Sequence, residues 1–290
     1  MSYIFVFVIC YSSNIKSKQI YHLFGLLIVF QFIICMYQFF ILHDPRPNGT
    51  LQNNNHVNYL LVSFIVVTFV IYRNYLKIFL SASFLLFMNG MGGVISVLIS
   101  LVIYVFFELK GKKKIFFSFI IFFAITVSTY FLQDRIHEQM KVLEVKERID
   151  SGQSGGDGGS LVWRIVTWTQ HIEYLQSENS LLLGFGIDTS SSVSPYSTPV
   201  SKFDPHSDYV LMIIDFGLFG SFLIVCYLLF IMSFTFIKRK KSPIFECQFY
   251  LMVALMSGAV VGNIVTQSTL MLVLFSLFGC LYRELKYDRF

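Results

Sequence analysis

Charged residues are scarce in this chain. They make up 13% of its 290 residues, whereas about a quarter of the residues in a soluble globular protein are charged. Hydrophobic residues make up 55% of the chain, and its mean hydropathy is +0.66. This composition excludes an ordinary soluble enzyme and predicts an all-α, polytopic integral membrane protein.

Cysteine is absent from the polar part of the sequence. All cysteines lie in apolar runs, without the spacing of a disulfide framework or of a metal motif: Cys10, Cys35, Cys226, Cys247 and Cys280. We expect them to be small core residues. The stretch Met1–Tyr11 has no basic region and no small-residue cleavage pattern, so we expect no removable signal peptide.

Motifs of the common soluble enzymes are also missing. The chain has no GxGxxG after a strand, no GxxxxGK[ST], no HExxH and no GxSxG. These absences exclude the dinucleotide, P-loop, zincin and serine hydrolase sites that such motifs mark.

Apolar runs suggest about nine transmembrane helices, at roughly 17 to 25 residues per span or somewhat fewer for the short ones. The runs lie near 1–13, 20–42, 58–72, 75–89, 91–109, 115–132, 209–237, 245–263 and 266–282. Only Asn89-Gly90 separates the fourth run from the fifth, which therefore form a kinked pair or a re-entrant hairpin.

Basic residues in the connections predict the orientation in the membrane, because Lys and Arg near span ends stay cytoplasmic. Most of the 22 basic residues fall on one side of the nine-span path, in the groups Lys16/Lys18, Arg73/Lys77, Lys110–Lys114, Lys238–Lys241 and Arg283–Arg289. We therefore expect the N-terminus outside and the C-terminus in the cytoplasm. These groups anchor the topology and contact membrane lipid, and we expect no nucleic acid partner.

The chain is expected to divide into three parts. Residues 1–132 form an N-terminal transmembrane bundle, 133–208 a large extracytoplasmic (periplasmic) loop, and 209–290 the C-terminal transmembrane helices. Within the loop, 133–149 has the pattern of an amphipathic surface helix, and the Gly/Ser-rich stretch 151–160 that of a flexible linker.

A second helix is expected in the loop, from Leu161 to Gln176. One face of it carries, at steps of four, three and four, Arg164, Trp168, His171 and Leu175. Glycines at 184 and 186 end this unit, and a Ser/Pro-rich run then leads to His206.

Each of these polar residues, taken alone, has an ordinary interpretation. Arg164 can be a surface charge, Trp168 an interfacial belt residue and His206 a solvated histidine. Asp215 lies inside the next apolar segment, where a carboxylate is either paired, hydrated or kept for function.

The order of the motifs resembles the O-antigen ligase and O-antigen polymerase superfamily. The residues that carry the resemblance are Trp163-Arg164 and Trp168, then Leu181-Leu182-Leu183-Gly184-Phe185-Gly186, then His206-Ser207-Asp208-Tyr209, then Asp215-Phe216-Gly217-Leu218-Phe219-Gly220. The family's small-residue turn usually carries an arginine, and this chain has Met91 there. Six expected spans before the loop are few for the family, so the resemblance is to a divergent or N-terminally shortened member.

The resemblance implies a helical, C-type glycosyltransferase fold in the bacterial inner membrane. It implies transfer of a glycan from undecaprenyl diphosphate to an acceptor sugar hydroxyl on the outer face, with inversion and with no metal, nucleotide or other cofactor. The matching residues would be His206 as catalytic base, Asp208 and Asp215 as orienting groups, Arg164, Arg135 and Arg148 as diphosphate ligands, and Trp168, Tyr209 and His171 as sugar contacts.

The leading hypothesis is a polysaccharide polymerase that acts on lipid-linked repeat units and extends a polysaccharide acceptor. A ligase that passes the glycan to a lipid or protein acceptor is the alternative. A glycolipid flippase or transporter, and a nonenzymatic subunit, are minor alternatives. A transporter would be expected to have polar groups throughout its spans, whereas here they gather in one loop. A separate flippase and a chain-length regulator are candidate partners.

Overall fold

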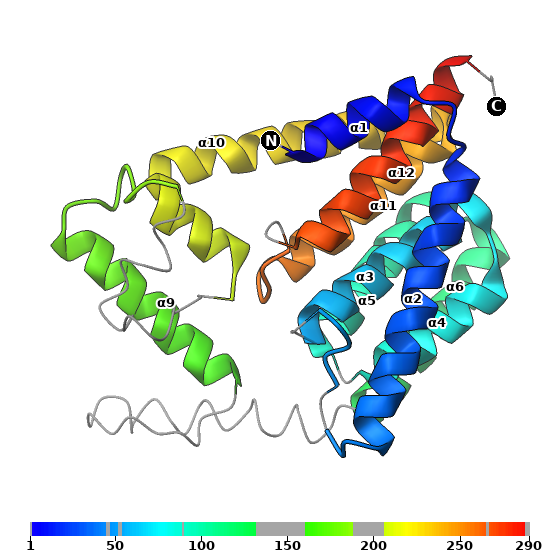
Figure 1. The fold of residues 1–290 in the computed structure, drawn as a ribbon, viewed down its shortest axis with the longest axis horizontal. Helices are drawn as coiled ribbons and strands as arrows, with labels where there is room; N and C mark the ends of the chain where they lie inside the picture. Colours follow the sequence, from blue (N-terminus) through cyan, green and yellow to red (C-terminus); the bar gives the residue numbers. More distant parts are fainter. Residues whose placement is uncertain are drawn as a thin grey trace. The chain divides into compact units, whose positions relative to one another are not determined.

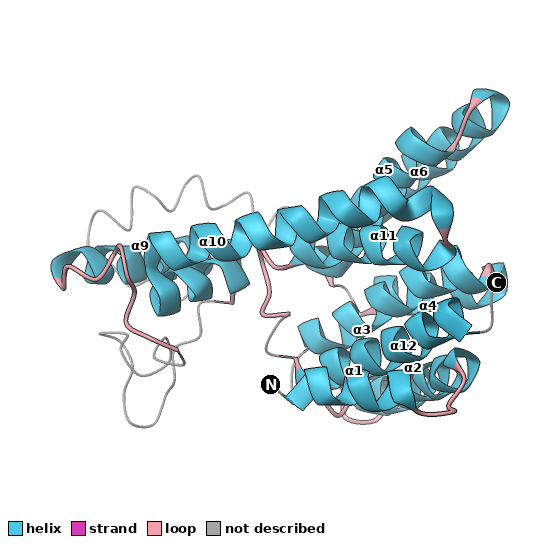
Figure 2. Ribbon diagram, turned by 90° about the horizontal axis from the view of Figure 1, so that it is seen from above, coloured by secondary structure: helices cyan, strands magenta, loops and turns pink. Residues whose placement is uncertain are grey.

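The chain is helical in the part that the computed structural model describes, which comprises residues 2–44, 47–51, 54–88, 90–131, 160–187, 206–264 and 267–287. No strand occurs in these ranges, in agreement with the predicted all-α class (Figure 2). The helices are α1 Ser2–Ser12, α2 Ser17–Phe40, α3 Asn54–Val67, α4 Tyr75–Phe87, α5 Met91–Glu108, α6 Gly111–Phe131, α9 Ser160–Ser177, α10 Asp208–Lys238, α11 Pro243–Gly258 and α12 Ser268–Tyr287. A π-helical turn, η1 Thr68–Tyr72, continues α3, and a 3₁₀ turn, η2 Arg239–Lys241, continues α10.

Each of the nine apolar runs contains a helix within a few residues of its expected position. Five helices of the described ranges are long and apolar enough to cross a membrane, namely α2, α3 with η1, α5, α10 with η2, and α12. The chain is therefore a multi-pass membrane protein. Nine spans, and the sidedness of the termini, stay predictions.

Two compact units make up the chain. One contains 1–123, 232–259 and 263–290, and the other contains 124–231 and 260–262. Helices from both ends of the sequence thus belong to the first unit (Figure 1).

Helix α3 forms the centre of the first unit. It packs against α2, α4, α5, α11 and α12, and all its residues from Val57 to Val67 are buried. From Tyr59 to Val67 only Ser63 is polar, so this part of α3 suits a fully buried position among other helices. Its Tyr59 hydroxyl donates to the carbonyl of Gly258 at 2.8 Å, so that the buried phenol is hydrogen-bonded.

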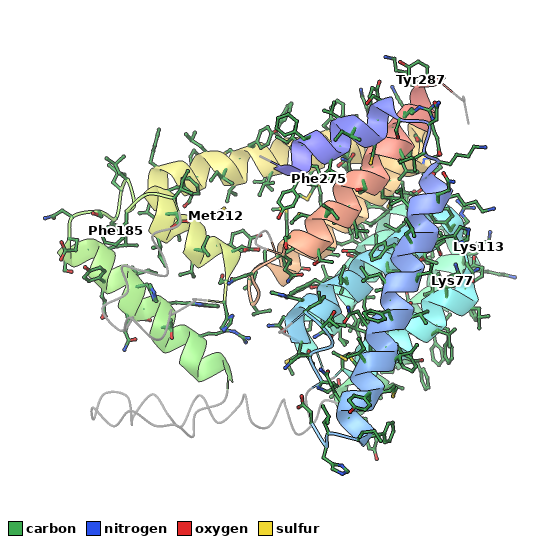
Figure 3. The ribbon with its side chains drawn as sticks, in the orientation of Figure 1. Lys77, Lys113, Phe185, Met212, Phe275 and Tyr287 are labelled. Atoms are coloured by element: carbon green, nitrogen blue, oxygen red, sulfur yellow. The ribbon has the colours of Figure 1, made fainter. Side chains whose placement is uncertain are left out.

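Several polar contacts in this unit tie helix ends together. Arg239 Nε lies 2.6 Å from Glu108 Oε1, and the Tyr250 hydroxyl donates to the same carboxylate at 3.2 Å. Helix α1 packs along α12, where Tyr3 and Phe275 bring their ring centroids to 6.0 Å (Figure 3).

Large apolar side chains cover the outside of several helices. On α2, for example, Leu23, Leu26 and Ile33 are 60%, 64% and 60% exposed. Such surfaces are costly in water and suit contact with lipid tails.

Candidate functional site

The helix that follows the Ser/Pro-rich run is broken at Gly217. This residue has φ 65° and ψ −175° inside α10, a backbone conformation that is essentially restricted to glycine. The first part of α10 therefore ends at Phe216, and the longer part begins after the break. The apolar segment that contains Asp215 and Gly217 is thus a short and a long helical piece joined at a sharp bend.

The loop 181–186 hydrogen-bonds the backbone on both sides of this break. Phe185 and Gly186 donate their N–H groups to the carbonyls of Ile214 and Asp215, each at 2.9 Å. In return, Leu218 N–H donates to Leu181 at 2.9 Å and Phe219 N–H to Leu182 at 3.2 Å. A broken helix in an apolar environment is tolerated only where other groups satisfy its freed backbone, and this loop supplies them.

The loop 181–186 crosses α10 at the break, and Gly184 and Gly217 let the two backbones approach closely. Both have positive φ, 74° and 65°. A Cβ atom on Gly184 would collide with the backbone of Asp215 and Gly217, and one on Gly217 would collide with the backbone of Leu182 and Gly184. The Leu-Leu-Leu-Gly-Phe-Gly and Asp-Phe-Gly motifs are therefore the two halves of one crossing.

Helix α9 packs beside the first part of α10. Leu175 is fully buried with Val210 and Ile214, and Trp168 and Phe185 pack against the same cluster. Figure 1 shows that α9 and the first part of α10 run in roughly the same direction, and Figure 3 labels Phe185 and Met212 on this unit. The second predicted loop helix is confirmed as α9, and its apolar face is the one that carries Trp168 and Leu175.

His171 is a buried residue of the same helix face. It is 3% exposed, and its Nδ1 lies 2.6 Å from the carbonyl oxygen of Thr167. Because a carbonyl only accepts, Nδ1 is the donor in this contact, and in the neutral imidazole Nε2 then carries the lone pair. Nε2 is buried and has no hydrogen-bond partner within the ranges that the structure describes, which leaves a buried acceptor in the α9 face that packs on α10.

The residues at the start of α10 form a second polar group. His206 precedes the helix with φ 49°, in the left-handed region where His is more common than most other residues. Ser207 and Asp208 are each 2% exposed, and Asp208 N–H donates to the carbonyl of Gly262 at 3.3 Å. The carboxylate of Asp208 lies in the first turn of α10, where the helix dipole stabilises a negative charge.

Asp215 lies at the break and is 5% exposed. It follows Asp208 by two helical turns, which at 1.5 Å per residue is about 10 Å along the axis. The two carboxylates therefore occupy opposite ends of the first part of α10.

The other predicted site residues lie as follows. Arg164 is half-buried on α9, one turn before Trp168, and Tyr209 is half-buried in the first turn of α10. Arg135 and Arg148, with the predicted helix 133–149 and the linker 151–159, lie outside the described residues. No cluster of three or more His, Cys, Asp or Glu side chains that could hold a metal ion occurs in the described part of the chain.

Sequence reasoning did not find the pairing of 181–186 with 214–219. The glycines of the two motifs gave a signal, since Gly184, Gly186 and Gly217 have positive φ, but nothing in the sequence joined the motifs. The Thr167 contact of His171 was also missed, although the four-residue spacing on a helix permits it.

A comparison with protein families matches this region. A family model described as O-antigen ligase covers residues 76–225, just over half of the chain. The match includes α9, the loop 181–186 and the broken part of α10. No curated protein matches the chain.

Proposed function

Because the chain belongs to the O-antigen ligase family, we propose that it is a polysaccharide polymerase that transfers glycan repeat units from undecaprenyl diphosphate to a growing surface polysaccharide. The observation that carries this proposal is the family match over 76–225, which contains the packed unit of α9 and α10. The family match supports a glycosyltransferase-like activity in general. The assignment as a polymerase, and not another enzyme of this kind, is our proposal.

Arg164 is the proposed ligand of the donor diphosphate. A guanidinium presents a planar fork of donors that matches phosphate oxygens, and it stabilises the charge that develops on a diphosphate leaving group. Arg164 lies near the N-terminal end of α9, about three turns before Leu175. This end of α9 is the one nearer to the start of α10 (Figure 1). Arg135 and Arg148 are further candidate ligands.

His206 is the proposed general base. The acceptor hydroxyl oxygen attacks the anomeric carbon of the donor sugar, and the bond from that carbon to the diphosphate oxygen breaks as the new glycosidic bond forms. The hydroxyl proton passes to the neutral imidazole, and undecaprenyl diphosphate leaves with the bonding electron pair. Imidazole titrates at about pH 6.5 in the unperturbed state, which suits this role near neutrality. Attack from the face opposite the leaving group inverts the anomeric centre, and the step uses no metal or cofactor.

Asp208 is the better placed of the two candidate orienting carboxylates. It is two residues from His206 in the chain, whereas Asp215 lies about two turns further along α10. A carboxylate holds a catalytic imidazole in one orientation and stabilises its protonated form. For Asp215 we propose a role at the break itself, where its own carbonyl accepts from Gly186.

Trp168, Tyr209 and His171 are proposed sugar contacts. The aromatic rings offer flat faces for sugar rings. The lone pair of His171 Nε2 is a hydrogen-bond acceptor without a protein partner in the described ranges, and such a buried group costs about 1–3 kcal/mol until it is satisfied. A sugar hydroxyl is a suitable donor for it.

A ligase is the second candidate, and the description of the matching family favours it. A ligase uses the same donor and the same chemistry, and passes the glycan to a lipid or protein acceptor. For either enzyme we propose the bacterial inner membrane as location, with the site on the outer face, and a flippase and a chain-length regulator as partners.

The glycan profile of a deletion strain tests this function. We expect single repeat units on the final acceptor if the protein is a polymerase, and long chains retained on the lipid carrier if it is a ligase. Electrophoresis of the surface glycans, with the wild-type gene supplied in trans as control, separates the two. If neither the glycans on the final acceptor nor those on the lipid carrier changed, the proposal would be contradicted.

Replacing Arg164 by lysine should lower kcat/KM for the lipid-linked donor. Lysine keeps the charge but loses the bidentate fork, and the loss of one charge-assisted hydrogen bond of about 1.5–3 kcal/mol corresponds to roughly 10- to 150-fold. The measurement is transfer by the purified protein at several donor concentrations. Arg283→Lys is the matched control, since Arg283 donates to Asn14 at 2.9 Å in the other unit. Full activity of Arg164→Lys would exclude bidentate recognition by this residue.

A further inference from the structure

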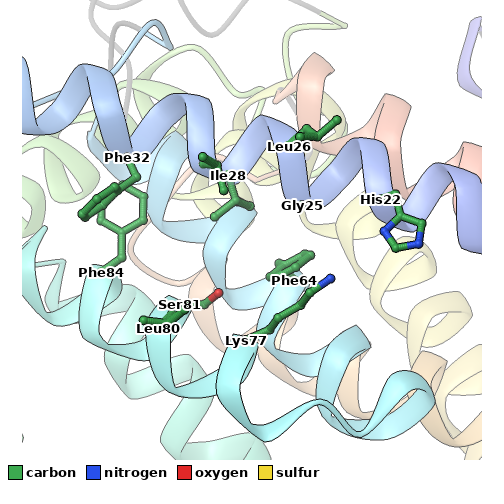
Figure 4. A pocket seen from close by; sticks show the side chains of 11 residues that line it. His22, Gly25, Leu26, Ile28, Phe32, Phe64, Lys77, Leu80, Ser81 and Phe84 are labelled. Carbon is green, nitrogen blue, oxygen red and sulfur yellow. The ribbon is translucent and has the colours of Figure 1, made fainter.

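A groove lies along α2 in the first unit, and none of the candidate-site residues lines it. It has a volume of about 530 Å³, within the range of about 300–1,000 Å³ that is usual for small-molecule sites. Its walls are formed by α2 and α4, and Phe64 of α3 contributes to its floor (Figure 4). Almost all of its lining is apolar, so its occupant must be largely hydrocarbon.

The two ends of the groove differ. At one end, Phe32 and Phe84 close it with an edge-to-face pair whose ring centroids are 5.0 Å apart. At the other end lie His22 and Lys77, the nitrogen-bearing side chains of the lining (Figure 4). An apolar groove with a cation at one end matches a molecule that has an anionic head and a hydrocarbon tail.

Lys77 is held at this end by its surroundings. Its Nζ lies 4.6 Å from the centre of the Tyr21 ring, and the Tyr21 ring stacks on Tyr72 with centroids 3.7 Å apart. Its backbone N–H donates to the Asn74 side chain at 3.1 Å, which caps the N-terminus of α4. A lysine in the first turn of a helix opposes the helix dipole, whereas a bound anion is attracted by both the ammonium and the dipole.

The length of the groove identifies the kind of tail. From His22 to Phe32 the lining follows ten residues of α2, or about 15 Å at 1.5 Å per residue. This is half of the roughly 30 Å hydrocarbon core of a bilayer, so the groove accommodates an acyl chain of one leaflet. An undecaprenyl tail is far longer than one leaflet.

We infer that this groove binds one anionic glycerophospholipid, with an acyl chain between α2 and α4 and its phosphate headgroup at Lys77 and His22. The leaflet is the one that the basic residues predict to be cytoplasmic, since Lys16, Lys18 and Arg73 belong to the same expected connections. Neighbouring cations of this kind attract anionic headgroups. The inference does not depend on the proposed glycosyl transfer.

Native mass spectrometry of the purified, delipidated full chain tests the inference. The probe is phosphatidylglycerol, compared with phosphatidylcholine of the same acyl composition. We expect one phosphatidylglycerol molecule to be retained, and Lys77→Gln to weaken its binding roughly fivefold. Gly25→Leu should abolish retention of both lipids, because a Cβ on Gly25 meets Phe64 at an ordinary 3.6 Å and the leucine side chain then fills the groove.

Lys240→Gln is the matched control, since Lys240 is an exposed lysine of the same unit outside the groove, and it should bind like the wild type. Thermal unfolding in detergent shows whether Gly25→Leu is folded, and Lys77→Gln provides an independent test if it is not. Equal retention of the two lipids by the wild type, or undiminished retention by Lys77→Gln, would overturn the inference. Preferential retention of undecaprenyl phosphate over phosphatidylglycerol would also overturn it.

Discussion

Replacing His206 by alanine is expected to lower kcat/KM for glycan transfer by about 10²–10⁴-fold, the usual contribution of a positioned general base. Alanine cannot accept the proton of the acceptor hydroxyl, so the step would depend on water. The measurement is transfer by the purified variant and chain length of the surface polysaccharide in a complemented deletion strain. Unchanged chain length would show that His206 is not the base.

A second variant separates catalysis from backbone conformation. His206 has φ 49°, a region that asparagine tolerates well and that alanine adopts at some cost. His206→Asn should therefore keep the fold at the start of α10 and still lose activity to a similar degree. A variant that retains activity with asparagine would indicate that the position needs a hydrogen-bonding group and not a base.

The chain offers a matched control for this experiment. His43 is exposed, has φ 54°, and lies in the first unit, outside the candidate site. His43→Asn is expected to leave both activity and stability unchanged. A comparable loss of activity in this variant would point to a general effect on the protein, and the assignment of His206 would then fail.

Much of the fold could be predicted from the sequence because the membrane restricts the secondary structure that an apolar run can adopt. A backbone in lipid must satisfy its own hydrogen bonds, so each long apolar run becomes a helix. The break between α4 and α5 was visible at Asn89-Gly90, and α4 ends at Phe87 while α5 begins at Met91. The positions of helices thus follow from local composition.

The packing of the helices could not be predicted in this way. Helix α3 is buried from Val57 to Val67, whereas α2 exposes Leu23, Leu26 and Ile33. Both helices are predominantly apolar, and lipid is as apolar as a protein core, so hydrophobicity does not distinguish them. The two helices differ in which other helices pack against them, and this depends on the fold of the whole chain.

The candidate site shows the same limit. The spacing on α9 predicted that Trp168 and Leu175 share a face, and the cluster with Val210 and Ile214 confirms it. The glycines at 184 and 186 predicted a turn there, because glycine adopts positive φ without steric cost. That the turn and the break form one crossing depends on contacts between distant segments, which no local pattern encodes.

Gly217→Ala is expected to disrupt the unit of α9 and α10 and to abolish transfer. Its backbone conformation costs a non-glycine residue about 1–3 kcal/mol, and its new Cβ would also collide with the carbonyl of Leu182 and the nitrogen of Gly184. The crossing cannot move apart without breaking the hydrogen bonds from Phe185, Gly186 and Leu218. Hydrogen exchange of peptides from 181–187 and 214–219 measures this directly, and their amides should exchange faster in the variant.

Three further glycines separate the collision from the backbone strain. Gly184→Ala combines positive φ with a collision and should behave like Gly217→Ala. Gly186 and Gly111 also have positive φ, 105° and 56°, but an added Cβ would meet nothing within 4 Å at either position. Gly186→Ala and Gly111→Ala should therefore show only the smaller effect of strain. Native-like exchange in Gly217→Ala, or equal effects in all four variants, would mean that the close crossing does not hold this unit together.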